Sequence, residues 1–256
     1  IDFAHGNDSD DGLSPERAFR SHAGRRFAPG DSVLFRRGGV FRGALHTSSG
    51  REGHPVIYGA YGDGPRPLFL GSVAVGDAEL WAPVAPSIWR YDGELPSEPC
   101  NLIFDGKRCG NLRFAFEDLQ EDGEWFSPVI GASSGGESGA ADAAAGAGRS
   151  SPEGVLYLHS AENPGRAYPD IECALWGERR LVDADHDVVI EGLAFRGSGV
   201  HGFQAFHPRH VVLRDCEFCF IGGAVWSRER RIRFGNGVEI WDGGSDCTVE
   251  ACLFDN

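Results

Sequence analysis

Three stretches of the chain share one pattern: VVIEGLAF at residues 188–195, VVLRDCEF at 211–218 and CTVEACLF at 247–254. Each has apolar residues at its first, third, sixth and eighth positions, separated in the middle by two polar or small residues. Alternation with a period of two is typical of a strand, and the central interruption indicates a bend between two such strands. Each repeat therefore predicts two short strands that meet at a corner.

The spacing of the repeats predicts how they stack. The first offset is 211 − 188 = 23 residues and the second is 247 − 211 = 36, which is 23 plus an insertion of 13. Val33 and Val56, each two residues before an aromatic residue, are also 23 apart. Repeats of this length without intervening helices predict an all-β fold, a single-stranded parallel β-helix with coils about 4.8 Å apart. We expect it to be right-handed because parallel crossovers almost always are. Four inward ladders follow: Val188/Val211/Cys247, Ile190/Leu213/Val249, Leu193/Cys216/Cys252 and Phe195/Phe218/Phe254.

The rest of the chain divides around these coils. Residues 1–100 are interpreted as an N-terminal cap with the first coils, and 181–256 as the later coils. Ser14, Pro15 and Glu16 predict a short capping helix over residues 15 to about 23, which Gly24 would end. Residues 101–180 are interpreted as a β-rich insertion that starts with a hairpin at 101–108. Within it, 130–149 is nearly all Gly, Ala and Ser, which predicts a flexible loop.

Composition excludes several classes of protein. With 24 Lys+Arg against 38 Asp+Glu, the formal net charge of −14 disfavours a nucleic-acid partner, whose phosphates need basic residues. No apolar run approaches the roughly 20 residues of a membrane helix, so we expect no membrane partner. The chain opens at Ile1 without Met, which removal of a signal peptide would explain, as would trimming of the chain. We therefore expect a secreted or periplasmic protein.

Two groups of motifs resemble a known family. GNDSDDGLSP at 6–15, PGDSVLF at 29–35 and RGGVF at 37–41 resemble the opening of pectate-lyase-like right-handed parallel β-helix proteins. The predicted insertion, with GKR at 106–108, EWF at 124–126, LYL at 156–158 and NP at 163–164, resembles an insert of bacterial β-helix glycoside hydrolases. The resemblance implies this fold and an extracellular, carbohydrate-active protein. Because the superfamily holds hydrolases, lyases, epimerases and adhesins, it does not select a reaction.

A candidate site lies on the strand before each core repeat. Aligning GFQAFH at 202–207 with GVEIWD at 237–242 places Phe203, Ala205, Val238 and Ile240 inside. A flat aromatic face beside a carboxylate suits a sugar ring, although exposed aromatic and acidic residues also occur on any surface of this kind. The predicted outward residues are Gln204, Phe206, Glu239 and Trp241, with His207 and Asp242 at the strand ends and Asn236 just before the second strand.

The 13-residue insertion, within 222–234, adds a cluster of arginines. Arg230 and Arg233 are candidate contacts for an acidic glycan such as a uronate polymer, because a guanidinium fork suits carboxylates and sulfates. An equally weighted alternative is that these arginines pair with the protein's own acids.

The candidate catalytic residues are Glu239, Asp242, Asp255 and His201. Hydrolysis needs two carboxyl groups, about 5–5.5 Å apart for retention or about 6.5–9.5 Å for inversion, and the sequence leaves the choice open. His201 aligns with Asn236 and is a candidate acid or base, or equally a structural histidine. The preferred function is a glycoside hydrolase that cleaves an extracellular, acidic polysaccharide, and a uronate lyase is the alternative enzyme. The lyase would use Arg230 or Arg233 as base, because the only lysine, Lys107, falls in the predicted hairpin turn. A glycan-binding β-helix or adhesin is the non-enzymatic alternative.

Hydrolysis by two carboxyl groups requires no cofactor, and calcium is an optional ligand of the protein. Asp8, Asp10 and Asp11 could bind calcium but lack EF-hand spacing. Cys216 and Cys219 form a Cys-x-x-Cys motif of the kind found in zinc sites. Cys216 falls on an inward ladder, however, where a thiol behaves as a small hydrophobe. The coil pattern stops at Phe254, and an open coil end exposes apolar ladders. We therefore expect a C-terminal continuation or a partner chain to cover that end.

Overall fold

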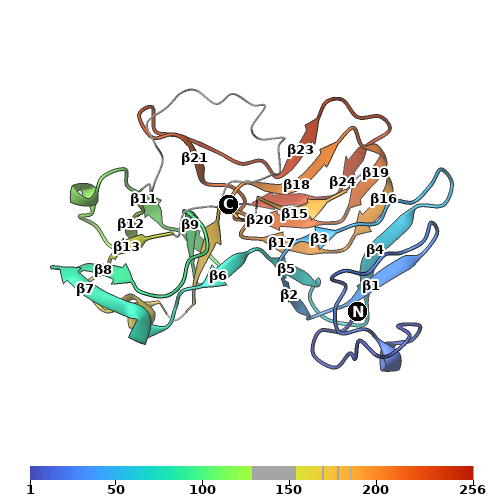
Figure 1. The fold of residues 1–256 in the computed structure, drawn as a ribbon, viewed down its shortest axis with the longest axis horizontal. Coiled ribbons are helices and arrows are strands. Elements are labelled where there is room, and N and C mark those ends of the chain that lie inside the picture. Colours follow the sequence, from blue (N-terminus) through green and yellow to red (C-terminus); the bar gives the residue numbers. More distant parts are fainter. Residues whose placement is uncertain (129–153, 169, 178, 185, 256) are drawn as a thin grey trace. The chain divides into compact units, whose positions relative to one another are not determined.

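The computed structural model describes residues 1–128, 154–168, 170–177, 179–184 and 186–255, so the predicted loop at 130–149 lies outside the described residues. The chain forms two compact units, Ile1–Val73 with Glu178–Asn256 (unit 1) and Ala74–Gly177 (unit 2). Both consist mostly of strands (Figure 1). No helix in the described part is long and apolar enough to cross a membrane.

Unit 1 is built from three sheets of parallel strands. The first sheet has the order β1 (Ser32–Arg36), β4 (Val56–Tyr61), β16 (His186–Glu191), β19 (Arg209–Arg214) and β24 (Thr248–Glu250). The second has the order β2 (Val40–Arg42), β5 (Leu68–Leu70), β17 (Ala194–Arg196), β20 (Glu217–Cys219) and β25 (Leu253–Asp255). The third has the order β3 (Leu45–His46), β15 (Arg180–Asp183), β18 (His201–Phe206) and β23 (Val238–Trp241). An antiparallel hairpin, β21 (Ala224–Ser227) with β22 (Ile232–Phe234), precedes β23.

The predicted stacking of the repeats is confirmed by strand register. Val188 pairs with Val211 and Ile190 with Leu213, and Leu213 pairs in turn with Val249. The aromatic ladder is present as well: the rings of Phe195, Phe218 and Phe254 are stacked with centroids 5.0 and 5.3 Å apart. Phe69 and Phe41 continue the same stack, each step 5.3 Å. Four of these rings, Phe41, Phe69, Phe195 and Phe218, pack in the core of unit 1, as the alternating pattern requires. Phe254, at the end of the stack, is 47% exposed.

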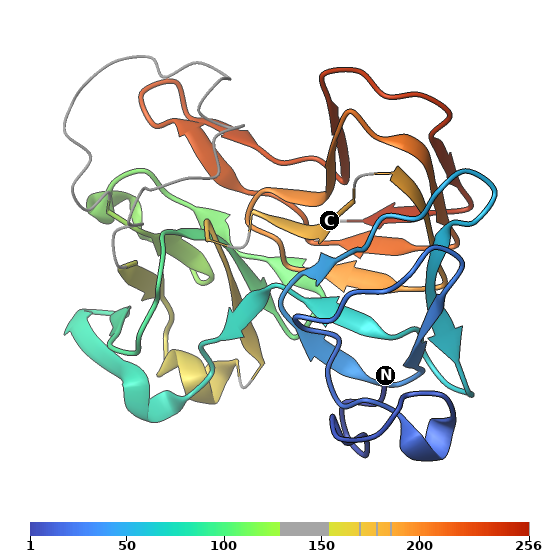
Figure 2. The ribbon, with the colours of Figure 1, turned by 45° about the vertical axis from the view of Figure 1, so that its right-hand side comes forward.

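The sheets continue across the insertion in the sequence. β4 pairs directly with β16, so that Val56 lies beside Val188, and β5 pairs with β17, so that Phe69 lies beside Phe195. In Figure 2 the cyan strands from before unit 2 lie next to the orange strands from after it. Unit 2 thus leaves the stacking of unit 1 uninterrupted.

One predicted spacing is wrong. Val33 pairs with Tyr58 rather than Val56, an offset of 58 − 33 = 25 residues instead of 23. The two offsets differ by two residues, and a slip of two keeps the same side chains on the same face of a strand. The apolar pattern alone therefore does not distinguish the two registers.

The predicted capping helix is also wrong. Only a 3-10 turn, η1 (Pro15–Arg17), forms, and the Ser14 side chain does not cap it. Ala18 is already extended, and its carbonyl oxygen accepts the Asn7 N–H at 2.9 Å. The Phe19 carbonyl accepts the Asp2 N–H at 2.8 Å. These bonds to the first residues of the chain hold the segment after Arg17 as a loop.

Unit 2 contains two groups of strands. One sheet has the order β11 (Asn111–Leu112), β12 (Glu124–Phe126), β13 (Leu156–His159), β8 (Ile88–Tyr91) and β7 (Trp81–Ala85). In the other, β9 (Pro99–Phe104) pairs antiparallel with β10 (Arg108–Cys109) and β14 (Ile171–Leu175). The predicted hairpin is present as β9–β10, and Asp105 and Gly106 have positive φ at its turn. The short elements η2 (Ala78–Leu80), η3 (Phe116–Asp118) and α2 (Pro164–Ala167) complete the unit, which β6 (Ser72–Ala74) enters.

The last strands of unit 1 expose apolar side chains. Four apolar side chains in inward rows or at strand ends of β23, β24 and β25 are 42–53% exposed: Ile240, Val249, Leu253 and Phe254. Ile240 was expected inside. It does pair with buried Ala205, but β23 is the outermost described strand of its sheet.

Candidate functional site

The candidate site is the outer face of the third sheet of unit 1. Strand register aligns His46 of β3 with Asp183 of β15, Gln204 of β18 and Glu239 of β23. We call these four residues the outer row. Their strand neighbours Leu45, Val182 and Phe203 belong to the core, so the outer row lies on the opposite face. The predicted alignment of 202–207 with 237–242 is therefore the register in the structure.

Glu239 is held by a residue of the preceding loop. The Asn236 side-chain amide donates a hydrogen bond to Glu239 Oε2, and the Asn236 backbone N–H donates to His201 Nδ1 at 3.3 Å. Asn236, a predicted substrate contact, thus also positions Glu239 and His201. The loop thereby links a carboxylate to a histidine on the adjacent strand.

His201 is a neutral histidine with a defined tautomer. It is only 4% exposed, and this burial lowers its pKa, against the opposing effect of Glu239. Because Nδ1 accepts the Asn236 N–H, the ring proton is on Nε2. His201 therefore offers an N–H donor beside Glu239 at neutral pH.

Asp183 supplies a second carboxylate that the sequence analysis missed. Its Oδ2 lies 2.8 Å from Arg180 Nη2 and 3.9 Å from His46 Nδ1, and its side chain is 32% exposed. Asp183 and Glu239 are separated by β18, which is two strand spacings or about 9.5 Å of backbone. The missing signal is the spacing: Asp183 precedes Gln204 by 204 − 183 = 21 residues, not by the 23 of the repeats.

Aromatic side chains flank this row. The rings of Phe206 and Trp241 are parallel within 15°, with centroids 6.3 Å apart, as expected from their register. The sequence analysis missed a second group of aromatic side chains beside the row. Phe234 of β22 contacts the His201 ring at 6.2 Å and Trp226 of β21 at 5.6 Å, and Trp226 is 52% exposed. An exposed tryptophan inside the insertion was the available signal.

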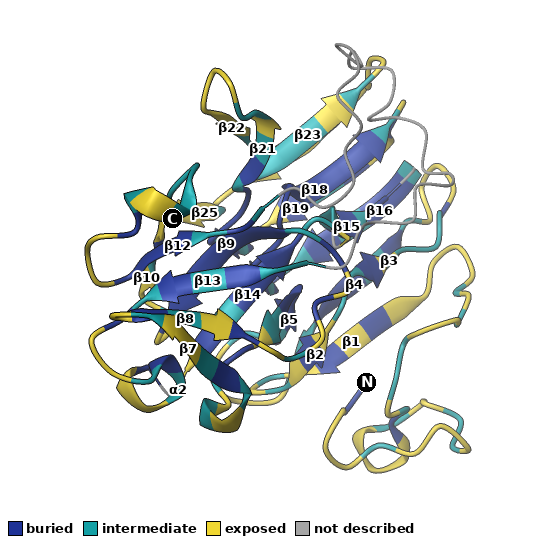
Figure 3. Ribbon diagram, turned by 60° about the vertical axis from the view of Figure 1, so that its left-hand side comes forward, coloured by how far each residue is buried: buried dark blue, intermediate teal, exposed yellow. Residues whose placement is uncertain are grey.

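Gln204 does not form part of an open surface. It lies on the outer face between Asp183 and Glu239 but is only 3% exposed. Figure 3 shows the contrast between buried β18 and the more exposed β23. Alternation predicts which face of the strand Gln204 occupies but not how far that position is covered.

Three predicted residues lie at corners or on another sheet. His207 and Asp242 follow β18 and β23 with positive φ, and His207 Nε2 lies 3.8 Å from Asp242 Oδ2 at the exposed corner. Asp255 lies on β25 of the second sheet, opposite Cys219, so the structure does not bring it to Glu239. Glu239 and Asp255 thus lie on different sheets of unit 1.

The predicted arginine contacts lie on the β21–β22 hairpin. Arg230 is exposed in its turn, and Arg233 donates from Nε to the Gly223 carbonyl at 3.0 Å, which fastens the hairpin to its own backbone.

The acidic residues near the N-terminus are engaged by arginines. Asp8 Oδ1 lies 2.9 Å from Arg25 Nη2, and Asp11 Oδ2 lies 2.6 Å from Arg17 Nη2. Among the described residues no group of three or more His, Cys, Asp or Glu side chains is arranged to hold a metal ion. Burial raises the pKa of the Cys216 thiol to about 12, so it stays protonated in the core.

Comparisons with known proteins concern the fold. No protein-family model matches the chain, and no curated protein matches it. A GH136 lacto-N-biosidase from Eubacterium ramulus is similar over 100% of this chain, with 14% identity and a TM-score of 0.50 for its selenomethionine derivative and 0.47 for the native protein. A structure described as a glycoside hydrolase is similar over 84% of this chain and 62% of its own length, with 9% identity and a TM-score of 0.45. The chain spans about a third (34%) of the lacto-N-biosidase.

Proposed function

We propose that this chain is the coil region of a secreted or periplasmic right-handed parallel β-helix enzyme that hydrolyses glycosidic bonds of an extracellular polysaccharide or oligosaccharide. The observation that carries the proposal is the outer row, where Asp183 and Glu239 stand two strands apart on the face that also presents stacked Phe206 and Trp241. Parallel three-sheet stacking and the fold likeness to the lacto-N-biosidase support it.

We assign a role to each carboxylate. A backbone separation of about 9.5 Å suits the wider carboxyl spacing of inverting hydrolases, where a water molecule fits between base and sugar. We propose Glu239, which lies on the same strand as Trp241, as the general acid. Asp183, in an ion pair with Arg180, is assigned as the general base that activates water.

The neighbouring groups bind and orient the sugar. Trp241 and Phe206 offer a flat apolar surface on which a pyranose ring can lie, and Trp226 offers a second exposed ring. The His201 Nε2–H can donate to a sugar hydroxyl or to the developing charge near Glu239. Asp242 at the exposed corner remains the alternative partner for Glu239.

The test is incubation with a panel of neutral, uronate-containing and sulfated polysaccharides, with reducing ends and ultraviolet absorbance measured together. Hydrolysis creates reducing ends without the absorbance of an unsaturated uronate, and this is the expected result. Absorbance would instead indicate a lyase. Binding without either product would indicate a glycan-binding protein.

Two matched variants localise the activity. Glu239→Gln should lower kcat by about a hundredfold or more, because a general acid commonly contributes that much. Glu52→Gln makes the same chemical change at an exposed loop position of unit 1 and should leave kcat unchanged. Equal rates for the Glu239 variant and the unsubstituted protein would remove the outer row from catalysis.

A further inference from the structure

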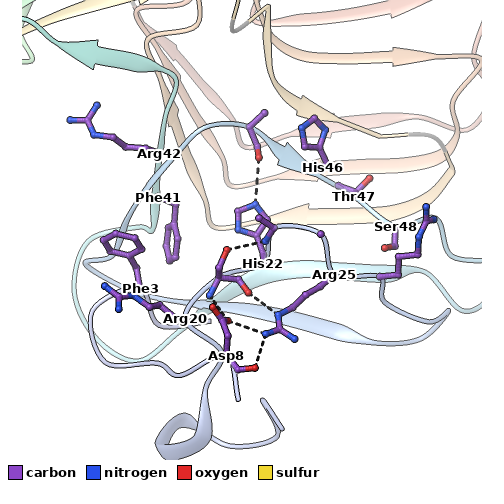
Figure 4. Close-up of a pocket in the computed structure, with 15 residues that line it drawn as sticks. Phe3, Asp8, Arg20, His22, Arg25, Phe41, Arg42, His46, Thr47 and Ser48 are labelled. Atoms are coloured by element: carbon purple, nitrogen blue, oxygen red, sulfur yellow. Dashed lines mark hydrogen bonds and ion pairs between the residues drawn. The ribbon is translucent and has the colours of Figure 1, made fainter. Parts of the chain in front are cut away.

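Unit 1 contains a pocket that the proposed reaction does not use. It has a volume of about 540 Å³ and lies between the segment that follows η1 and the strands β2 and β3 (Figure 4). Of its lining residues, four are arginines and one is an acid: Arg20, Arg25, Arg26, Arg42 and Asp8. On a protein with a formal net charge of −14, this concentration of positive charge stands apart.

The single acid does not neutralise the pocket. Asp8 pairs with Arg25, whose Nε also donates to the Ser21 carbonyl at 2.9 Å. Arg20 and Arg26 are exposed and form no ion pair with any residue in the described part of the chain. Two guanidinium groups therefore remain for an anion from solution, and the planar fork of each fits a carboxylate or a sulfate.

The floor of the pocket is aromatic and uncharged. The His22 ring packs edge-on against Phe35 and Phe41, with centroids 5.5 and 6.5 Å apart, and its Nε2 lies 3.4 Å from the Ala44 carbonyl oxygen. Burial lowers the pKa of His22, so the ring is neutral at pH 7. In Figure 4 it lies in the middle of the pocket.

The rim also offers an aromatic surface. Phe3 is 50% exposed, contacts Phe41 edge-on at 6.3 Å and has the Arg20 guanidinium 5.7 Å from its ring centroid. A charged sugar fits this rim better than an inorganic anion does. Its charged group can bind Arg20 while the apolar face of the sugar ring packs on Phe3.

His46 connects this pocket to the outer row. It lines the pocket and is also the first residue of the outer row, whose last residue is Glu239. The distance from β3 to β23 is three strand spacings, about 14 Å, which a short oligosaccharide can span.

We propose that the arginine-lined pocket is a remote subsite for an acidic sugar residue, so that the substrate is an oligosaccharide or polysaccharide carrying carboxylate or sulfate groups. This inference rests on the proposed function. It moves the anion contacts from Arg230 and Arg233 of the hairpin, where the sequence analysis placed them, to Arg20 and Arg26.

Binding is measured by calorimetry in the Glu239→Gln background, so that no ligand is cleaved. The probes are a uronate tetrasaccharide, a sulfated tetrasaccharide, an uncharged glucose tetrasaccharide and inorganic sulfate. We expect at least one acidic tetrasaccharide to bind about tenfold or more tightly than the neutral one, with an affinity that falls as salt is raised. The two acidic probes distinguish a carboxylate from a sulfate ester.

The double variant Arg20→Gln/Arg26→Gln should lose this preference for acidic sugar, whereas Arg209→Gln, the same change at an exposed position of β19, should keep it. Unchanged melting of both variants shows that the fold is intact. Retained preference in the double variant, or its loss in Arg230→Gln instead, would overturn the pocket. Inorganic sulfate that binds as tightly as the tetrasaccharides would overturn the sugar assignment.

The outcome is separable from that of the proposed function. If no glycan of the panel is hydrolysed by the unsubstituted protein but the arginine-dependent binding persists, the subsite stands and the hydrolase proposal fails. If neutral glycans are hydrolysed and no acidic ligand is preferred, the hydrolase proposal stands and the subsite fails.

Discussion

Replacing Glu124 by Gln should destabilise unit 2 in a way that depends on pH. The Glu124 side chain on β12 is 1% exposed. Burial raises the pKa of Glu124, but Arg113 and two backbone amides together lower it by more, so that the pKa is about 2. Arg113 Nε donates to Oε1 at 2.7 Å, and the N–H groups of Gln120 and Glu121 donate to Oε2 at 2.7 and 2.9 Å. The folded state thus strongly favours the carboxylate.

The size of the effect follows from the two pKa values. A fall from 4.5 to about 2 corresponds to about 3 kcal/mol of stability supplied by the ionised form. Arg113 is itself 42% exposed, and water screens the pair, so we take about 2–3 kcal/mol. Because the folded pKa is the lower one, this stability is fully present above about pH 4.5 and is lost as the pH falls towards 2.

The assay is urea unfolding at pH 7 and at pH 2.5. Glu124→Gln should lower the free energy of unfolding by about 2–3 kcal/mol at pH 7, and its difference from the unsubstituted protein should shrink at pH 2.5. Glu117→Gln, at an exposed position of η3, is the matched control and should have little effect. A difference for Glu124→Gln that is the same at both pH values would refute the reasoning.

Three further outcomes follow from unit 1. Phe195→Ala removes the middle of the stacked rings and should cost about 3–5 kcal/mol in urea unfolding; a loss below about 1 kcal/mol would contradict a packed ladder. Asn236→Ala should lower kcat about tenfold with little change in KM, because it positions Glu239, and Asn236→Gln should restore part of the rate; a change in KM alone would instead indicate a substrate contact. The first sugar released should have inverted anomeric configuration by NMR, and retention would exclude Asp183 as the base.

The ladder residues could be predicted from sequence because alternation with a period of two determines which face of a strand each side chain occupies. This accounts for the stack of Phe195, Phe218 and Phe254 and for the pairing of Phe206 with Trp241. The same argument does not determine offsets that differ by two residues, and so it missed the pairing of Val33 with Tyr58.

The parts of the site that were missed depend on contacts between distant segments. Asp183 joins the outer row through a repeat of 21 residues, which the 23-residue pattern hides. Arg20, Arg26 and His46 line one pocket only because the segment after η1 folds as a loop instead of the expected helix. The backbone hydrogen bonds from Asp2 and Asn7 that hold this loop cannot be predicted from a cap motif or from the spacing of repeats.

The most direct test of the proposed site is a crystal structure of the Glu239→Gln variant with an oligosaccharide that the unsubstituted protein cleaves. We predict a sugar ring stacked on Trp241 and Phe206, with the glycosidic oxygen within hydrogen-bond distance of the substituted side chain and Asp183 on the opposite side of the ring. An oligosaccharide bound away from the third sheet of unit 1, with the outer row empty, would contradict the account.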